Sequence, residues 1–289
     1  DTDDSEDLIA NTVFTQTVGV AFSTEGNAVV TGTNEDFTVT VNGNDVTIIY
    51  AGEEYVMYEL SGTANDGFFK LYSAKKQGIT LNGVSITNPN GAAINVQGTT
   101  AEPSKGKRTF IVLKGENTLA DGANYTETPT TEDEKAAMFG EGQFIFSGEG
   151  SLNVAATGKS GIVSDDYVHF ISGAITVNVS SSSTVNGSDT LKPACVKGKD
   201  YVRMTGGALS LTSTGTGSKG ISSDGNGYFY GGTVNVTVTG SNFGSNGGGG
   251  GVHGGWGNNS SDGVSAKGLK FDGNLIFKGS KVVVNCTAH

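Results

Sequence analysis

Short stretches in which apolar and polar residues alternate run through the whole chain, and in its second half they recur in a fixed order. One phrase of six residues has glycine and an aliphatic residue at its second and third positions and ends in aspartate. Each copy leads through an alternating stretch to another glycine and a valine-rich run. The copies occupy 160–165, 219–224 and 267–272, and the glycines that follow are Gly173, Gly232 and Gly279. A unit repeated in this way is typical of a solenoid.

Weaker copies extend the series. The runs 137–154 and 194–211 have the same order, which makes five units in register, and 69–96 has the texture of two or three further coils. Each unit spends about two dozen residues on three short strands, a length within the usual range for structural repeats. Equivalent strands of successive coils would pair in parallel at ~4.8 Å. We therefore predict an all-β fold, a single right-handed parallel β-helix over residues 12–289.

Composition agrees with this prediction because 46 glycines accompany abundant threonine, valine, serine and asparagine. β-branched residues favour strands, and glycine and asparagine favour tight corners. The one helix-like piece, 131–138, is expected to make a turn or two. Insertions near 180–191 and 239–262 interrupt the repeat. The acidic residues 1–11 are expected to form a disordered spacer after a removed signal or lipid anchor.

The charge balance limits the classes of partner. With 29 acidic and 18 basic residues, the net charge is −11, which argues against nucleic acid and anionic membranes. No apolar stretch approaches the ~20 residues that span a bilayer, so membrane insertion is not expected. We expect an exported monomer at the cell surface or in the periplasm.

The two cysteines are interpreted as free thiols. Cys195 aligns with Ile162 and Ile221 of the neighbouring repeats, so its thiol should point into the core, and Cys286 ends the last strand. These places favour buried thiols over a disulfide or a metal site. The three histidines have no spacing that suits zinc.

Alignment of the repeats brings acidic residues to one corner of successive coils, with Gly198 interrupting the column. Asp166 lies beside the column. The candidate metal ligands are Glu141, Asp165, Asp166, Asp224 and Asp272. Stacked carboxylates repel each other unless a cation or proton intervenes, and oxygen ligands of this kind suit Ca²⁺. The alternative is that these acids cap turns by accepting hydrogen bonds from backbone amides.

The stretch before the glycine of each repeat alternates, so one set of side chains should face the core and the other the solvent. The inward set comprises Val168, Phe170, Val202, Met204, Phe229 and Ile276. The outward set comprises Tyr167, His169, Ile171, Tyr201, Arg203, Thr205, Tyr228, Tyr230, Leu275 and Phe277. Aromatic rings stack on sugar faces, and basic groups meet hydroxyls or carboxylates. The candidate polysaccharide-binding residues are therefore Tyr167, His169, Tyr201, Arg203, Tyr228 and Tyr230.

An alternative reading makes the outward aromatic residues an inner layer beneath one of the two insertions. The second insertion contains a dense glycine run and the single tryptophan, Trp256. Glycine-rich segments cost much entropy to order, so a mobile loop is expected. Trp256 is then either a ligand contact or a plug against the side of the solenoid.

Taken together, these phrases resemble a family of secreted bacterial carbohydrate-binding domains built as pectate-lyase-like right-handed β-helices. The likeness covers residues 44–285 and rests on 78–84, 91–94, 113–119, 219–224, 231–236 and 266–275. It implies binding of cell-wall polysaccharides such as cellulose and polygalacturonate, no clear lyase activity, and calcium at some of Asp165, Asp224 and Asp272. The chain departs from the family pattern at Gly198, which replaces the aspartate, and at Ser160, which replaces a lysine.

We therefore predict a non-catalytic protein that binds pectin-like polygalacturonate or cellulose-like glucan with the help of calcium. The alternative from another class is a cell-surface adhesin or scaffold whose partner is a protein or a host glycan. A pectate-lyase-type enzyme comes third. Arg203 lies one coil from Asp165 and Asp166 and is a candidate base, but the basic element of a polygalacturonase-like site is missing.

Overall fold

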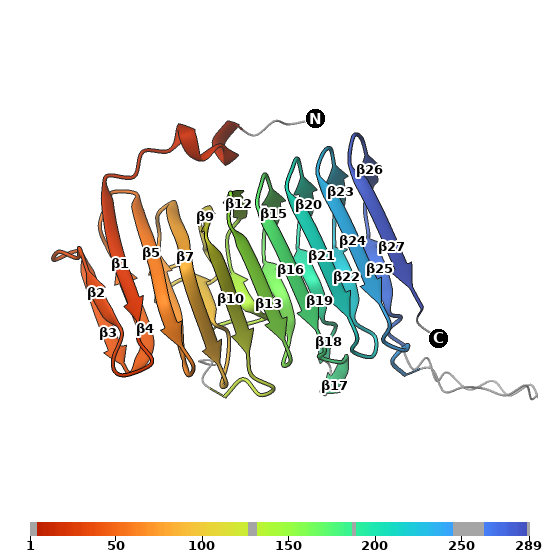
Figure 1. Ribbon diagram of the computed structural model, residues 1–289, viewed down its shortest axis with the longest axis horizontal. Coiled ribbons are helices and arrows are strands. Elements are labelled where there is room, and N and C mark those ends of the chain that lie inside the picture. The colour runs from red at the N-terminus through yellow and green to blue at the C-terminus, as the bar shows by residue number, and fades with distance from the viewer. Residues whose placement is uncertain (1–4, 127–131, 187–188, 245–262, 288–289) are drawn as a thin grey trace, which may run out of the picture.

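The computed structural model describes residues 5–126, 132–186, 189–244 and 263–287. In it the chain winds into a parallel β-helix whose coils follow one another in chain order along the long axis (Figure 1). Each complete coil contributes one strand to each of three faces, and each strand pairs in parallel with its equivalents in the coils before and after. The predicted all-β, single-domain solenoid is confirmed. Among the described residues, no helix has the length and apolar character to cross a membrane.

The first face carries the stretch that precedes the glycine of each repeat. Its strands are β7 (Gln77–Asn88), β9 (Thr109–Lys114), β12 (Phe144–Gly148), β15 (Tyr167–Phe170), β20 (Tyr201–Met204), β23 (Asn226–Phe229) and β26 (Leu275–Phe277). The second face carries the run after that glycine. Its strands are β10 (Glu116–Asp121), β13 (Ser151–Ala156), β16 (Ala174–Val179), β21 (Ala208–Ser213), β24 (Thr233–Val238) and β27 (Lys281–Cys286). The long strand β7 pairs with both β9 and β10, so it joins the two faces around a corner.

The third face is a separate sheet of nine strands. They are β3 (Phe37–Asn42), β4 (Asn44–Tyr50), β6 (Gly67–Ser73), β8 (Ile94–Gln97), β11 (Ala136–Gly140), β14 (Ser160–Ser164), β19 (Ala194–Gly198), β22 (Lys219–Ser223) and β25 (Lys267–Phe271). β3 runs antiparallel to β4 at the N-terminal end of this sheet. There, β1 (Gln16–Phe22) pairs with β5 (Val56–Ala64) in parallel and with β2 (Val29–Thr31) in antiparallel fashion. Antiparallel strands thus flank the first coils.

The core is a set of side-chain columns that run along the solenoid axis. Phe146 stacks on Phe170 with ring centroids 5.1 Å apart, and Phe229 stacks on Phe277 at 5.3 Å. Gly173 and Gly232, which precede second-face strands, have φ of 94° and 76°. L-residues with a Cβ rarely adopt that region, which explains why the repeat places glycine there.

The structure corrects several predictions from the sequence. Residues 136–140 form strand β11 and not the end of a helix, because they pair with β8 on one side and β14 on the other. Tyr228 pairs with Ile276 and Phe229 with Phe277. Phe277 therefore follows the inward column and Ile276 points outward, one residue from the predicted register.

The weak repeat at 194–211 is also displaced by one residue. Val196, and not Cys195, pairs with Ile162 and Ile221. Cys195 is nevertheless buried in the core as predicted, whereas Cys286 is exposed, and both are free. Gly198 pairs with Ser164 and Ser223, so the residue in the acidic column of this coil is Lys199.

The acidic N-terminal stretch is not a disordered spacer where the structure describes it. It forms two short 3-10 helices, η1 (Ser5–Asp7) and η2 (Ile9–Asn11). The segment lies over the first face, on the side of the solenoid that carries β9, β12 and β15 (Figure 1). In the first insertion, β17 (Thr184–Asn186) and β18 (Asp189–Leu191) form an antiparallel hairpin.

Candidate functional site

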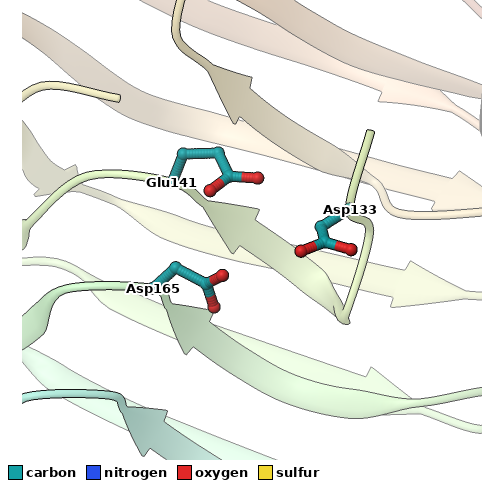
Figure 2. A group of neighbouring side chains, drawn as sticks. All are labelled: Asp133, Glu141 and Asp165. Carbon is teal, nitrogen blue, oxygen red and sulfur yellow. The ribbon is translucent and has the colours of Figure 1, made fainter. Parts of the chain in front are cut away.

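Three carboxyl groups converge at one corner of the central coils. Oxygen atoms of Asp133, Glu141 and Asp165 all lie within 4.8 Å of one another. Glu141 directly follows β11 and Asp165 directly follows β14 (Figure 2). These strands are neighbours, and the Asp165 amide donates to the Gly140 carbonyl at 3.0 Å, so the two acids are stacked as the sequence predicts. Asp133 reaches the same place from the segment that leads into β11.

The electrostatics of this acidic cluster are unfavourable to three negative charges. Glu141 is 7 % exposed, and burial, followed by the negative charge of Asp165, raises the pKa of its carboxyl group to about 7. Lys135 Nζ forms ion pairs with Asp165 and with Asp133, the latter at 2.8 Å. The Lys135 ammonium group thus pairs with both aspartates. Glu141 retains its proton more readily than an ordinary glutamate does.

The remaining predicted metal ligands lie elsewhere. Asp166 faces the neighbouring corner, where Gln143 donates to its carboxylate, and burial together with the charge of Asp200 raises its pKa. Asp224 and Asp272 sit beyond Lys199 in the column, close to two lysines. The structure therefore divides the predicted column, because a positive residue separates its two halves.

Asp133 is the ligand candidate that sequence reasoning missed. It belongs to a run of three acids, Glu132 to Glu134, immediately before an apolar strand. That run resembles the acidic first turn of a helix, and the sequence therefore predicts a short helix there. The signal that points to the correct answer is the strand pattern of 136–140, because a strand there leaves the acids in a corner loop.

The predicted outward aromatic face is partly covered. Tyr167 and His169 do point away from the core, but they are 6 % and 5 % exposed. Both contact Asp7 of the N-terminal segment: the Tyr167 hydroxyl donates to Asp7 Oδ1 at 2.6 Å, and His169 Nδ1 lies 2.7 Å from Asp7 Oδ2. Arg108 Nε lies 3.1 Å from Asp7 Oδ1. Asp7 is therefore held by three side chains of the first face.

Apolar contacts hold the same segment in place. Ile9 and Phe14 pack against a small cluster of Phe110, Ile145 and Tyr167. The N-terminal segment, and not an insertion, therefore covers this part of the first face. Where the first insertion is described, Thr190 and Leu191 lie near the third face, beside Lys197. Burial raises the pKa of Asp7, but hydrogen bonds from His169 and Tyr167 and the charge of Arg108 outweigh it, so the pKa lies below its ordinary value.

A ladder of aromatic rings continues beyond the cover. Tyr167 stacks on Tyr201 with centroids 4.3 Å apart and an interplanar angle of 12°, and Tyr228 follows at 5.8 Å, near perpendicular. The Arg203 guanidinium lies 5.6 Å from the Tyr230 ring. Tyr201, Tyr228 and Tyr230 are half-buried, so their rings retain accessible surface. Trp256 lies outside the described residues.

Comparison with known proteins gives the family. The model of the family described as carbohydrate-binding domain-containing proteins matches residues 42–289, which is most of the chain. The chain belongs to this family. The family is described by its carbohydrate-binding domain. The acidic cluster and the tyrosine ladder are the two candidate sites on this molecule.

A solved structure supports the fold independently. The polysaccharide lyase-like protein from C. thermocellum, solved as a gadolinium derivative, is 19 % identical over 95 % of this chain and 97 % of that chain, with a TM-score of 0.59. At this identity the likeness concerns the architecture, a complete β-helix of similar extent. No curated protein matches the sequence.

Proposed function

We propose that the protein binds a polysaccharide without cleaving it, and that a calcium ion at the acidic cluster assists this binding. The family supports carbohydrate binding. The observation that carries the metal is the convergence of Asp133, Glu141 and Asp165, with a buried glutamate whose pKa is raised to about 7. Burial and the charge of Asp165 raise this pKa, and a bound cation would offset both effects.

The donor set suits calcium by its chemistry. Ca²⁺ takes about 6–8 oxygen ligands, and three carboxylates supply only part of such a shell. The remaining positions would be available to water or to the oxygens of a sugar. Such an ion would link the protein to the hydroxyl or carboxylate groups of a pectin-like polygalacturonate. Lys135, which now pairs with two of the acids, would have to turn aside.

The tyrosine ladder supplies the other half of the proposal. Tyr201, Tyr228 and Tyr230 present partly accessible rings on three positions of neighbouring coils. Aromatic rings can cover the apolar faces of sugars in either an acidic polysaccharide or a cellulose-like glucan. Arg203, predicted as an outward contact, lies beside them but is only 6 % exposed, so the tyrosines carry this part of the proposal. Export to the cell surface or periplasm, and action as a monomer, belong to the same proposal.

A second candidate function is that of an adhesin or scaffold. The observation that favours it is the burial of Tyr167 and His169 beneath the N-terminal segment, because a covered aromatic layer holds a fold together and does not bind sugar. Its partner would be a protein or a host glycan.

The deciding experiment is calorimetric titration of polygalacturonate and of a soluble cellulose derivative, with calcium and then with chelator. Ultraviolet absorbance of the unsaturated product is followed in parallel. We expect calcium-dependent heat without new absorbance. An increase in absorbance would show a lyase. The absence of heat in every condition would favour the adhesin or scaffold function.

A variant links that result to the acidic cluster. Asp133→Asn removes one charged oxygen donor and is expected to weaken calcium binding by at least about tenfold, since affinity depends on the number of charged ligands. Asp66→Asn, at an exposed turn, is the matched control and should bind calcium as the wild type does. Equal affinities for Asp133→Asn and the wild type would place the ion elsewhere.

A further inference from the structure

A groove lined by lysines lies on the outer side of the third face, over its C-terminal strands. It consists of a pocket of about 440 Å³ and a second of about 360 Å³. Both are lined by Lys192, Lys197 and Asp224, so they adjoin. The second pocket extends to Lys135 and Asp165, at the edge of the acidic cluster. On a chain of net charge −11, such a collection of lysines needs an explanation.

Lys219 is the residue that distinguishes this groove from an ordinary solvated surface. Its side chain lines the first pocket and is only 5 % exposed. Its Nζ donates to the Gly217 carbonyl over a long 3.4 Å. Burial, followed by the charges of Lys192, Lys267, Lys270 and Lys197, lowers the pKa of Lys219 to about 8. A buried ammonium group without a carboxylate contact is costly unless a ligand compensates for it.

The acids of the groove do not balance its lysines. Lys197 Nζ lies 3.2 Å from Asp224, and Lys270 Nζ lies 2.5 Å from Asp272. The first pocket therefore brings together five lysines, of which two have carboxylate partners at these distances. The surplus is positive, and it faces an open hollow.

The arrangement of the lysines follows the repeat of the solenoid. Lys219 pairs with Lys267 in the next coil, and Lys197 and Lys270 occupy equivalent outward positions two coils apart, with Ser222 between them. Parallel strands repeat at ~4.8 Å. Positive charges therefore recur along the axis at intervals, as the negative charges do along a linear acidic polymer.

We propose that this lysine groove binds the anionic groups, carboxylates or sulfates, of an acidic polysaccharide, and that it does so without calcium. The inference rests on the proposed polysaccharide binding and adds a second site to it, with a defined class of ligand. Ammonium groups form charge-assisted hydrogen bonds with such anions. Because one end of the groove reaches Asp165, a polymer that fills it would meet the acidic cluster with its next residues.

The test uses the whole chain in the presence of chelator. Polygalacturonate, a sulfated dextran and a neutral cellulose derivative are titrated separately, at low and at raised salt. We expect the acidic polymers to bind and the neutral polymer to give no heat that depends on the lysines. Salt should weaken the acidic interaction because it screens charge. Comparison of the carboxylated and sulfated polymers shows which anion the groove prefers.

Three variants assign the binding to the groove. Lys219→Gln and Lys267→Gln are each expected to weaken binding of the acidic polymer by about tenfold, the usual scale of one lost hydrogen bond to a charged group. Lys267 is exposed, so its variant should fold even if Lys219→Gln does not. Lys114→Gln, an exposed lysine on the first face, is the matched control. Protection of Lys219 from amine acylation by bound polymer gives a second readout.

The outcomes separate this inference from the proposed function. Binding of acidic polymer only with calcium, or unchanged binding by both groove variants, overturns the lysine site and leaves calcium-assisted binding intact. Absence of binding to every polymer, with or without calcium, overturns both. Calcium-independent binding that both variants weaken supports the groove even if Asp133→Asn has no effect.

Discussion

The position of Glu141 in the repeat explains the raised pKa of its carboxyl group. The Glu141 side chain lies next to Asp165 of the following coil because both residues directly follow a third-face strand, and at this corner it is only 7 % exposed. A carboxyl group in such surroundings favours its neutral form.

The raised pKa of Glu141 makes stability depend on pH. Between the ordinary glutamate pKa of 4.5 and about 7, the folded protein binds more protons than the unfolded chain, so the free energy of unfolding falls as the pH rises through this range. Glu141→Gln should remove this part of the slope, as measured by urea unfolding at several pH values in chelator. Added calcium should also flatten it. A slope that Glu141→Gln leaves unchanged would contradict the assignment.

At the scale of single residues, the sequence predicts which residue types meet at a corner better than it predicts the exact register of the coils. The stacking of Glu141 and Asp165 follows from aligning two strong repeats. Lys199 was missed because its repeat has lysine where the other repeats have the final acid, and its own aspartate, Asp200, comes one residue later. A shift of one residue in the alignment exchanges glycine for lysine in the column. Asp133 was missed because an acidic run before an apolar stretch fits a helix start as well as a loop.

The N-terminal segment is the element whose role the sequence hid. Its acidic residues look like a solvated tail, yet Asp7 is 1 % exposed. Its partners Arg108, Tyr167 and His169 lie more than 100 residues away in the chain, and nothing in the local pattern of residues 5–11 indicates them. By contrast, the strands of the three faces were predictable because each has the same alternation of apolar and polar residues as the equivalent strands in adjacent coils.

Replacement of Asp7 should release this segment. Asp7→Ala leaves Arg108 and His169 without their buried carboxylate, which costs roughly 3 kcal/mol, equivalent to about a hundredfold larger detached population. Limited proteolysis read by mass spectrometry should show correspondingly faster cleavage within 8–13. Glu6→Gln, which alters an exposed pair with Arg108, is the control and should change the rate by less than about fivefold. Equal rates for the two variants would refute the role of Asp7.

The same contact has a defined pH dependence. Because the pKa of Asp7 is lowered in the folded protein, its contribution to stability is complete above the ordinary aspartate value and is lost as the pH falls below it. Cleavage within 8–13 by an acid protease should therefore accelerate at low pH in the wild type. Asp7→Asn should cleave at a rate that changes much less over the same range.

On the scale of the whole molecule, each coil packs only against its neighbours, so the stability of a position depends on where along the axis it lies. Phe146 is stacked between coils and fully buried, whereas Phe277 in the last described coil is 48 % exposed. The architecture was predictable because one unit recurs. The ends were not, because they have no repeat with which to align.

Two truncations of the same residue type measure this difference. Phe146→Ala should lower the free energy of unfolding by about 3–5 kcal/mol, since it leaves a cavity among packed rings. Phe277→Ala removes less buried surface and should cost less than about half as much. Urea unfolding of both variants provides the comparison. Equal losses would show that the last coil is as well packed as the centre.

The N-terminal segment also determines how the molecule would carry a mechanical load. Asp7 is bound to Arg108, which directly precedes β9, and to Tyr167 and His169 of β15. These contacts lie several coils from β1, where the chain enters the solenoid. A tensile force applied to the N-terminus would thus first shear a short polar and aromatic contact, and only afterwards unzip β1 from β5. In an optical trap, the first extension step should be small and reversible, and Asp7→Ala should abolish it.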